Sequence, residues 1–256
     1  MAPPLLEGLG IRKHFGGLSV LTNVGFSVGD GEIVALIGPN GAGKTTILNI
    51  ISGVLRPTAG SIRFAGRELS RLAPHRISRL GVARTFQTPR PFCELTVGEN
   101  LKLATAFTGR PAPAPAGDLL ALVGLQGQVP VPTRSLTAGG GKLLELAMAL
   151  ALGPRVLLLD EPMAGLTSPE VNRAMALLRE IRDRWGIALV WVEHVMRAVM
   201  ETADRAVVLH HGEVIATGPP RAVARDPRVI EAYLGHSGSA DLRNSRGWGP
   251  AVRGER

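Results

Sequence analysis

The residues best suited to chemistry form one run in which four residues separate a glycine from a Gly-Lys-Thr triplet. The run is Gly38-Pro39-Asn40-Gly41-Ala42-Gly43-Lys44-Thr45-Thr46. Glycines let the backbone curl so that successive N–H groups point at one phosphate group. Lys44 can reach the β- and γ-phosphates of a nucleotide, and the Thr45 hydroxyl can bind Mg²⁺. The spacing therefore predicts a phosphate-binding loop, against the alternative of a glycine-rich turn without a ligand.

A second candidate group is the acid pair Asp160-Glu161, which follows the apolar residues 156–159. Two acids at the carboxyl end of a buried parallel strand lie where such sheets bind ligands. Asp160 could hold Mg²⁺ through water, and Glu161 could activate the attacking water. The alternative, a charged strand end, is disfavoured by the phosphate loop upstream.

Three further residues are candidates because of their positions. Gln87 and His194 follow the predicted strands 81–86 and 187–192, so both should lie at the same sheet edge as the phosphate loop and could sense a γ-phosphate. Phe15, on a turn before the loop, could stack on a nucleotide base or be a core residue at a strand end.

The elements that would position these residues alternate along the chain. Apolar runs and turn residues predict strands over 5–11, 18–28, 32–37, 60–66, 81–86, 155–160, 187–192, 205–210 and 213–217. Helices are predicted over 45–51, 73–80, 95–107, 118–123, 142–152, 168–185, 194–202 and 221–234. This alternation indicates an α/β fold. Residues 110–117, rich in Pro and Ala, should be an exposed, extended linker, and residues 236–256 should be disordered.

Composition narrows the class of protein. The 256 residues include 29 Lys and Arg against 21 Asp and Glu, a net charge of +8. The arginines are scattered without interleaved aromatic residues, so no nucleic-acid partner is expected. No apolar run approaches the roughly 18 residues that span a bilayer, and no signal-peptide pattern is present, so a cytoplasmic protein is expected. Cys93 is the single cysteine, which excludes an internal disulfide.

Taken in order, the motifs resemble the nucleotide-binding subunit of an ABC transporter over residues 5–235. They are Gly38–Thr46, Gln87, Leu136-Thr137-Ala138-Gly139-Gly140, Leu157–Glu161, Ala164-Gly165-Leu166-Thr167 and His194. Finer features look like the branched-chain amino-acid uptake branch, most of all its ATPase usually lettered G: Phe15-Gly16-Gly17, Ala83-Arg84-Thr85-Phe86-Gln87, Leu95-Thr96-Val97-Gly98-Glu99-Asn100 and Val229-Ile230-Glu231-Ala232-Tyr233-Leu234-Gly235.

The resemblance implies a P-loop NTPase (RecA-like) core with an antiparallel β subdomain and an inserted α-helical subdomain. The implied divisions are a first core part at 1–88, a helical subdomain with the signature segment at 89–150, a second core part at 151–235 and a tail at 236–256. It also implies a catalytic set of Lys44, Glu161 as base and His194 as the switch that contacts the γ-phosphate. The implied Mg²⁺ set is Thr45, Gln87 and Asp160, acting through water.

The implied ATP-binding set extends across two subunits. It comprises Phe15 on adenine, Gly38, Pro39, Asn40, Gly41, Ala42, Gly43, Lys44, Thr45, Thr46, Gln87 and Asp160, with Thr137 and Gly139 reaching the ATP of a partner ATPase. The signature departs from the family pattern, because Thr137, Ala138, Gly140 and Gly141 replace the usual residues. The family usually has an arginine, an aspartate and an acid at three further positions, where this chain has Met148, Thr167 and Val195. These departures suggest pairing with a different ATPase.

The function implied is ATP hydrolysis that drives import of branched-chain amino acids. The expected partners are a second ABC ATPase, two polytopic permease subunits and indirectly a substrate-binding protein, with the chain peripheral on the cytoplasmic face of the inner membrane. Urea, another amide or lipopolysaccharide are alternative cargoes. A soluble ABC ATPase acting on nucleic acid or ribosomes would usually have two nucleotide domains or a coiled coil. A small-molecule kinase would not need Asp160, Glu161, Gln87 and His194 together.

Overall fold

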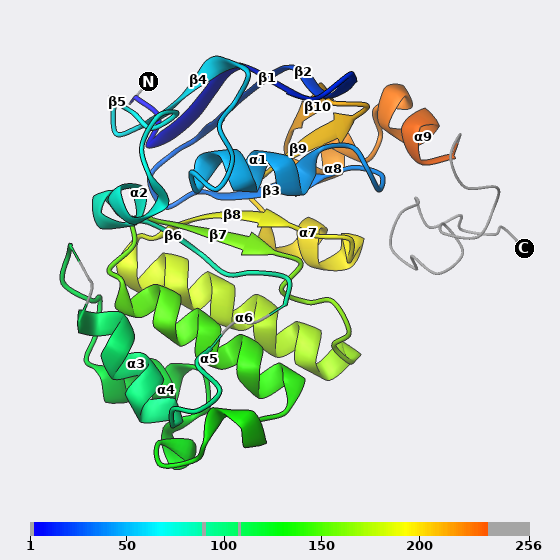
Figure 1. The fold of residues 1–256 in the computed structure, drawn as a ribbon. Coiled ribbons are helices and arrows are strands. Elements are labelled where there is room, and N and C mark those ends of the chain that lie inside the picture. Colours follow the sequence, from blue (N-terminus) through cyan, green and yellow to red (C-terminus); the bar gives the residue numbers. More distant parts are fainter. Residues whose placement is uncertain (1–2, 89–90, 107–108, 235–256) are drawn as a thin grey trace, which may run out of the picture.

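The computed structural model describes residues 3–88, 91–106 and 109–234, and its strands form two sheets (Figure 1). The expected tail at 236–256 lies outside the described residues. The larger sheet has the spatial order β10 (Glu213–Gly218), β9 (Arg205–His210), β3 (Ile33–Ile37), β8 (Ala188–Val192), β7 (Val156–Asp160) and β6 (Val82–Arg84). Its strands pair in parallel except for β10, which is antiparallel to β9.

The smaller sheet is antiparallel. Its order is β2 (Leu18–Val28), β1 (Leu6–Phe15), β4 (Ala59–Phe64) and β5 (Arg67–Glu68). β1 continues to Phe15, beyond the predicted end at residue 11, because Phe15 still pairs with Leu18 across the turn. The two sheets together confirm the predicted P-loop core with an antiparallel β part.

Helices cover both faces of the larger sheet. On one face α1 (Lys44–Ile51) lies between the two sheets, whereas α3, α4, α5 and α6 lie on the opposite face (Figure 1). The bounds of the remaining helices are α2 (Pro74–Leu80), α3 (Val97–Ala106), α4 (Ala116–Leu122), η1 (Gln126–Gln128), η2 (Thr133–Ser135), α5 (Ala138–Ala151), α6 (Ser168–Trp185), α7 (Met196–Thr202), α8 (Pro220–Val223) and α9 (Pro227–Leu234).

Strand periodicity explains the two-sided core. Successive side chains of a strand point to opposite faces. Val34 and Leu36 of β3 therefore pack in the core that contains α1 and the smaller sheet. Ala35 and Ile37 pack in the other core, with α5 and α6. Because both faces are covered, the central strands are continuously apolar, which is why the sequence pattern identified them.

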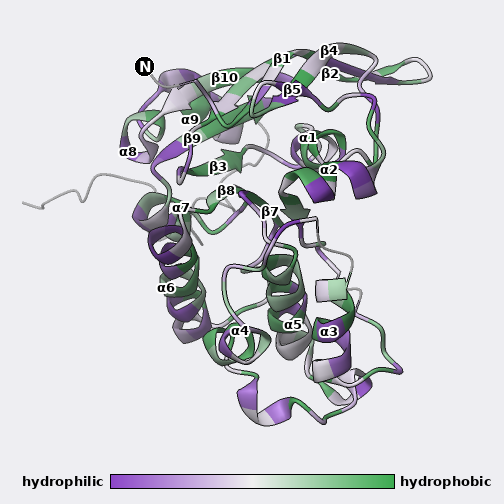
Figure 2. Cartoon of the chain, turned by 90° about the vertical axis from the view of Figure 1, so that its left-hand side faces the viewer, coloured by the Kyte–Doolittle hydropathy of each residue, from purple (hydrophilic) through white to green (hydrophobic). Residues whose placement is uncertain are grey.

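α6 has one apolar face and one polar face. Its buried residues Val171, Met175, Leu178 and Ile181 recur at helical spacing. Hydrophilic residues mark its outward side in Figure 2. Within the described ranges, none of the helices combines the length and the apolar character needed to cross a membrane.

Four further predicted elements differ from the structure. α5 begins four residues earlier than predicted, because the Thr137 hydroxyl caps it by accepting the Gly140 N–H at 3.1 Å. β6 stops at Arg84, short of the predicted end at 86. The linker at 110–117 is not fully exposed, since residues 112–114 are half-buried and α4 already begins at Ala116.

The predicted helix over 221–234 is the fourth difference, because it is two helices. A proline disfavours helical backbone at the residue before it, so α8 and α9 are separated before Pro227. Asp226 then accepts the Arg228 N–H at 2.9 Å and starts α9.

Candidate nucleotide-binding and catalytic site

The phosphate loop joins β3 to α1 and depends on its glycines. Gly38, Gly41 and Gly43 have φ of +146°, +79° and +104°, a region that side chains with a Cβ rarely adopt. A Cβ on Gly38 would collide with the Leu209 carbonyl, whereas a Cβ on Gly41 would project into open space. The loop is therefore packed against β9 on one side and forms an open cradle on the other, as a phosphate group requires.

Lys44 turns back onto this loop. Its Nζ donates to the carbonyls of Gly38 at 2.7 Å and Pro39 at 2.9 Å, and only 6% of the residue is exposed. Burial lowers the pKa of Lys44, and the nearby Glu161 and Asp160 oppose that shift. The ammonium is thus held over the cradle by neutral acceptors, which charged phosphate oxygens can replace with stronger bonds.

Asp160 ends β7 beside the start of α1. Its Oδ1 lies 3.4 Å from the Thr45 hydroxyl, and its Oδ2 accepts Nη2 of Arg84 at 3.0 Å. The fold therefore brings together the hydroxyl and the carboxylate that were expected to bind Mg²⁺. Both supply the hard oxygen ligands that Mg²⁺ prefers.

Glu161 is the centre of a second group of predicted residues. Its Oε1 lies 2.9 Å from Nε2 of His194, and its Oε2 accepts Nε2 of Gln87 at 2.9 Å. Glu161 has a φ of +50°, in the left-handed region, and its N–H donates to the Val192 carbonyl. Three residues far apart in the sequence thus meet at one edge of the sheet.

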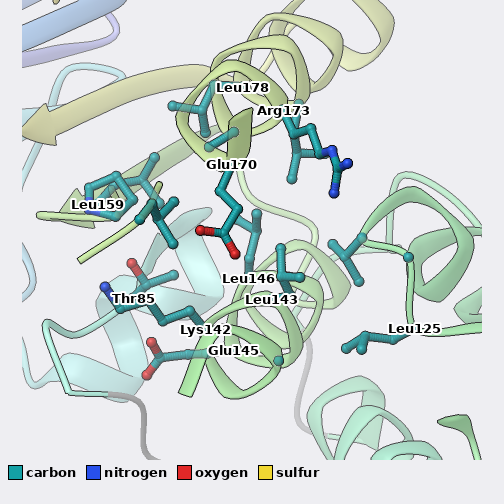
Figure 3. A pocket seen from close by; sticks show the side chains of 18 of the residues that line it. Thr85, Leu125, Lys142, Leu143, Glu145, Leu146, Leu159, Glu170, Arg173 and Leu178 are labelled. Atoms are coloured by element: carbon teal, nitrogen blue, oxygen red, sulfur yellow. The ribbon is translucent and has the colours of Figure 1, made fainter. Parts of the chain in front are cut away.

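Phe15 and the signature residues lie outside this hydrogen-bonded group. Phe15 is 46% exposed at the end of β1, so the alternative of a core residue is wrong. Thr137 and Gly139, at the start of α5, line a hollow of about 610 Å³ between α5 and α6 that also borders Glu161. The Glu170 carboxylate points into this hollow from α6 (Figure 3). The hollow at the signature thus adjoins the carboxylate pair of the same chain.

The departure at Thr167 has a local explanation. The Thr167 N–H and hydroxyl both donate to Glu170 at 2.7 Å, in a capping box that starts α6. Threonine therefore supplies the helix cap at the position where the family usually has aspartate.

Three residues near the site were missed by the sequence reasoning. Arg84 forms the buried pair with Asp160, although a charged residue within an apolar strand could have indicated it. Glu193 is 1% exposed and accepts N–H groups of Met163, His194 and Val195, and burial raises its pKa. The pKa of Tyr233 is raised to about 12, because burial has a larger effect than the opposing hydrogen bond from the Gly38 backbone.

The fold and the site define a P-loop nucleoside triphosphatase, with a phosphate loop, a carboxylate pair and two polar residues at one sheet edge. A family model described as ABC transporter matches residues 21–164, and one described as branched-chain amino acid ATP-binding cassette transporter matches residues 213–238. The chain belongs to the ABC transporter ATP-binding family and is an ATPase.

Known proteins of this family resemble the chain over most of its length. The high-affinity branched-chain amino acid transport ATP-binding proteins BraF of Pseudomonas aeruginosa and LivG of Escherichia coli K12 are 37% and 38% identical, each over 93% of this chain and 100% of the relative. A solved ATP-binding cassette, MJ1267 in its ADP conformation, has a TM-score of 0.82 and 30% identity over 91% of this chain and 100% of that one. These matches favour the transporter interpretation over the kinase and nucleic-acid alternatives.

Proposed function

We propose that the chain is the ATP-hydrolysing subunit of an importer for branched-chain amino acids. The observation that carries the hydrolytic part is the meeting of Gln87 and His194 on Glu161, next to Asp160 and the phosphate loop. The match of residues 213–238 to the branched-chain family model, together with the named relatives, supports the cargo.

The loop and Lys44 would bind the triphosphate, with Phe15 stacked on adenine. Mg²⁺ fits the site only in part, because the described residues contain no cluster of three or more His, Cys, Asp or Glu that could hold a metal. That is the pattern expected when substrate phosphates complete the coordination of Mg²⁺. Thr45, Asp160 and Gln87 would hold the ion, which would neutralise charge on the phosphates.

Glu161 would act as the general base on the attacking water. Both of its oxygens are engaged in the structure, one with His194 and one with Gln87. Each oxygen keeps a lone pair that can accept a proton from water, and we infer that one of these partners moves toward the nucleotide to make room for that water. His194, which is exposed, is the partner suited to contact a γ-phosphate.

The permease subunits would dock on the helical subdomain, for which we keep the bounds 89–150. A largely apolar hollow of about 290 Å³ there is lined by Phe86, Phe92, Leu103 and Met148, among others. Phe92 is 55% exposed, and Asn100 fixes its backbone by accepting its N–H at 2.8 Å and donating to its carbonyl at 3.0 Å. An exposed aromatic on a fixed backbone beside an apolar hollow is suited to protein binding. The chain would thus lie on the cytoplasmic face of the membrane.

A pull-down from native membranes tests the proposal. Tagged Glu161→Gln protein with ATP should recover a second ATPase and two polytopic subunits, together with an amino-acid-binding protein. Phe92→Ala should lose the polytopic subunits, whereas Leu18→Ala, which removes another exposed apolar side chain, should keep them. Recovery of ribosomes or nucleic acid without membrane proteins would contradict the proposal. Recovery of lipopolysaccharide-export subunits would contradict the cargo alone.

A further inference from the structure

Arg84 is a buried cation that has no role in the hydrolysis proposed above. It ends β6, the strand next to β7, and its side chain is only 6% exposed. Its Nη2 donates to Asp160 Oδ2 at 3.0 Å, and its Nη1 donates to Asn49 Oδ1 at 2.7 Å and Ser52 Oγ at 3.0 Å. One guanidinium therefore ties the end of β7 to α1, the helix that follows the phosphate loop.

The arrangement divides the two oxygens of Asp160 between different partners. Oδ2 is bound to Arg84, while Oδ1 faces the Thr45 hydroxyl at 3.4 Å. A carboxylate held through one oxygen by a planar fork cannot rotate freely, because rotation would break the charge-assisted bond. The oxygen that remains for other ligands is thus kept on the Thr45 side.

We propose that Arg84 is a positioning residue that holds Asp160 through Oδ2, so that Oδ1 and the Thr45 hydroxyl together face the place where Mg²⁺ binds with the nucleotide. This inference rests on the proposed role of Asp160 in binding Mg²⁺. Arg84 itself would touch neither the ion nor ATP. The bonds to Asn49 and Ser52 fix the guanidinium, so α1 contributes both Thr45 and the support for the carboxylate opposite it.

Binding of a non-hydrolysable fluorescent ATP analogue tests the proposal without measuring turnover. The affinity is measured in EDTA and across a Mg²⁺ titration for the wild type, Arg84→Lys and Asn49→Ala. Lysine keeps the charge but lacks the fork, and Asn49→Ala loosens Arg84 without touching Asp160. Arg155→Lys is the matched control, because Arg155 pairs with Asp30 in an exposed ion pair.

Supporting residues of metal ligands typically contribute about 10- to 100-fold to metal affinity, so Arg84→Lys should raise the half-saturating Mg²⁺ concentration by about tenfold. Asn49→Ala should also raise the half-saturating Mg²⁺ concentration, by a smaller factor. This variant should fold even if Arg84→Lys does not, because alanine favours the helix. Affinity in EDTA should be unchanged, and Arg155→Lys should match the wild type.

An unchanged Mg²⁺ requirement in the variants that fold would overturn the inference, as would an equal loss of affinity in EDTA. These results leave the proposed function intact if the wild type responds to Mg²⁺. If the affinity of the wild type for the ATP analogue did not depend on Mg²⁺, this would contradict the proposed role of Asp160. The inference about Arg84 would then fail as well.

Discussion

At the scale of single residues, Glu161 has the most direct consequence for activity. Glu161→Gln keeps the size of the side chain but replaces one acceptor oxygen with an amide donor and removes the base. ATP binding should remain, and hydrolysis should fall by roughly 10²- to 10⁴-fold, which corresponds to about 3–5 kcal/mol of barrier. Phosphate release and nucleotide affinity, measured on the same preparation, separate the two effects.

The control for this variant is Glu180→Gln on the exposed side of α6, where the carboxylate pairs only with Arg184 in the described structure. It should hydrolyse ATP at the wild-type rate. Wild-type turnover in Glu161→Gln would contradict the assignment of Glu161 as the general base. Another acid at the sheet edge would then have to fill that role.

Glu193 should make stability depend on pH. Burial raises its folded pKa, so its contribution to the free energy of unfolding is present below the ordinary glutamate pKa of about 4.3 and is lost as the pH rises through the folded pKa. Denaturant unfolding of the wild type and Glu193→Gln, compared at several pH values, isolates this residue. The advantage of the wild type over the variant should shrink with rising pH, and a growing advantage would show that the three N–H bonds outweigh burial.

At the scale of elements, the capping box of α6 can be tested by itself. Thr167→Ala removes the hydroxyl and should lower the free energy of unfolding by about 1 kcal/mol. Thr167→Ser keeps the hydroxyl and should stay within about 0.5 kcal/mol of the wild type. Urea unfolding measures both. A loss as large in Thr167→Ser as in Thr167→Ala would mean that something other than the cap stabilises this turn.

Sequence patterns identified the elements that depend only on residues close together in the sequence. The apolar strand before Asp160 and the strand–loop–helix around Lys44 follow from periodicity and glycine spacing alone. The pattern did not identify contacts between distant segments, such as Arg84 with Asn49 or Tyr233 with Gly38, because these depend on how strands are ordered in space. Nor did it separate α8 from α9, because the stretch on both sides of Pro227 was interpreted as one helix.

Burial across segments also explains the misjudged linker. Prolines and alanines at 110–117 have the composition of an exposed spacer, yet Arg110 Nε donates to the Gly153 carbonyl and Ala114 packs on the core. Small apolar residues can cover a core as readily as they can form a spacer, and composition does not distinguish the two. The site was predictable to a larger extent, since strand ends of a parallel sheet share one edge whatever their order.

At the scale of the whole molecule, the altered signature predicts the oligomeric state. Thr137 and Ala138 stand where family members usually have serine and glycine, so two copies of this chain should pair weakly around ATP. Purified Glu161→Gln protein with ATP should remain mostly monomeric in analytical ultracentrifugation. Thr137→Ser combined with Ala138→Gly should increase dimer formation. A stable ATP-dependent homodimer with full hydrolytic activity in the unaltered chain would contradict a division of labour between different ATPases.

The engagement of both Glu161 oxygens has a consequence for chains that have not yet found their partners. A newly made copy would be able to bind ATP at its phosphate loop before it meets the membrane subunits. Because His194 and Gln87 hydrogen-bond the base, we expect such a copy to hydrolyse ATP slowly. Copies without partners would then stay loaded with nucleotide, and hydrolysis would speed up on assembly with a membrane complex.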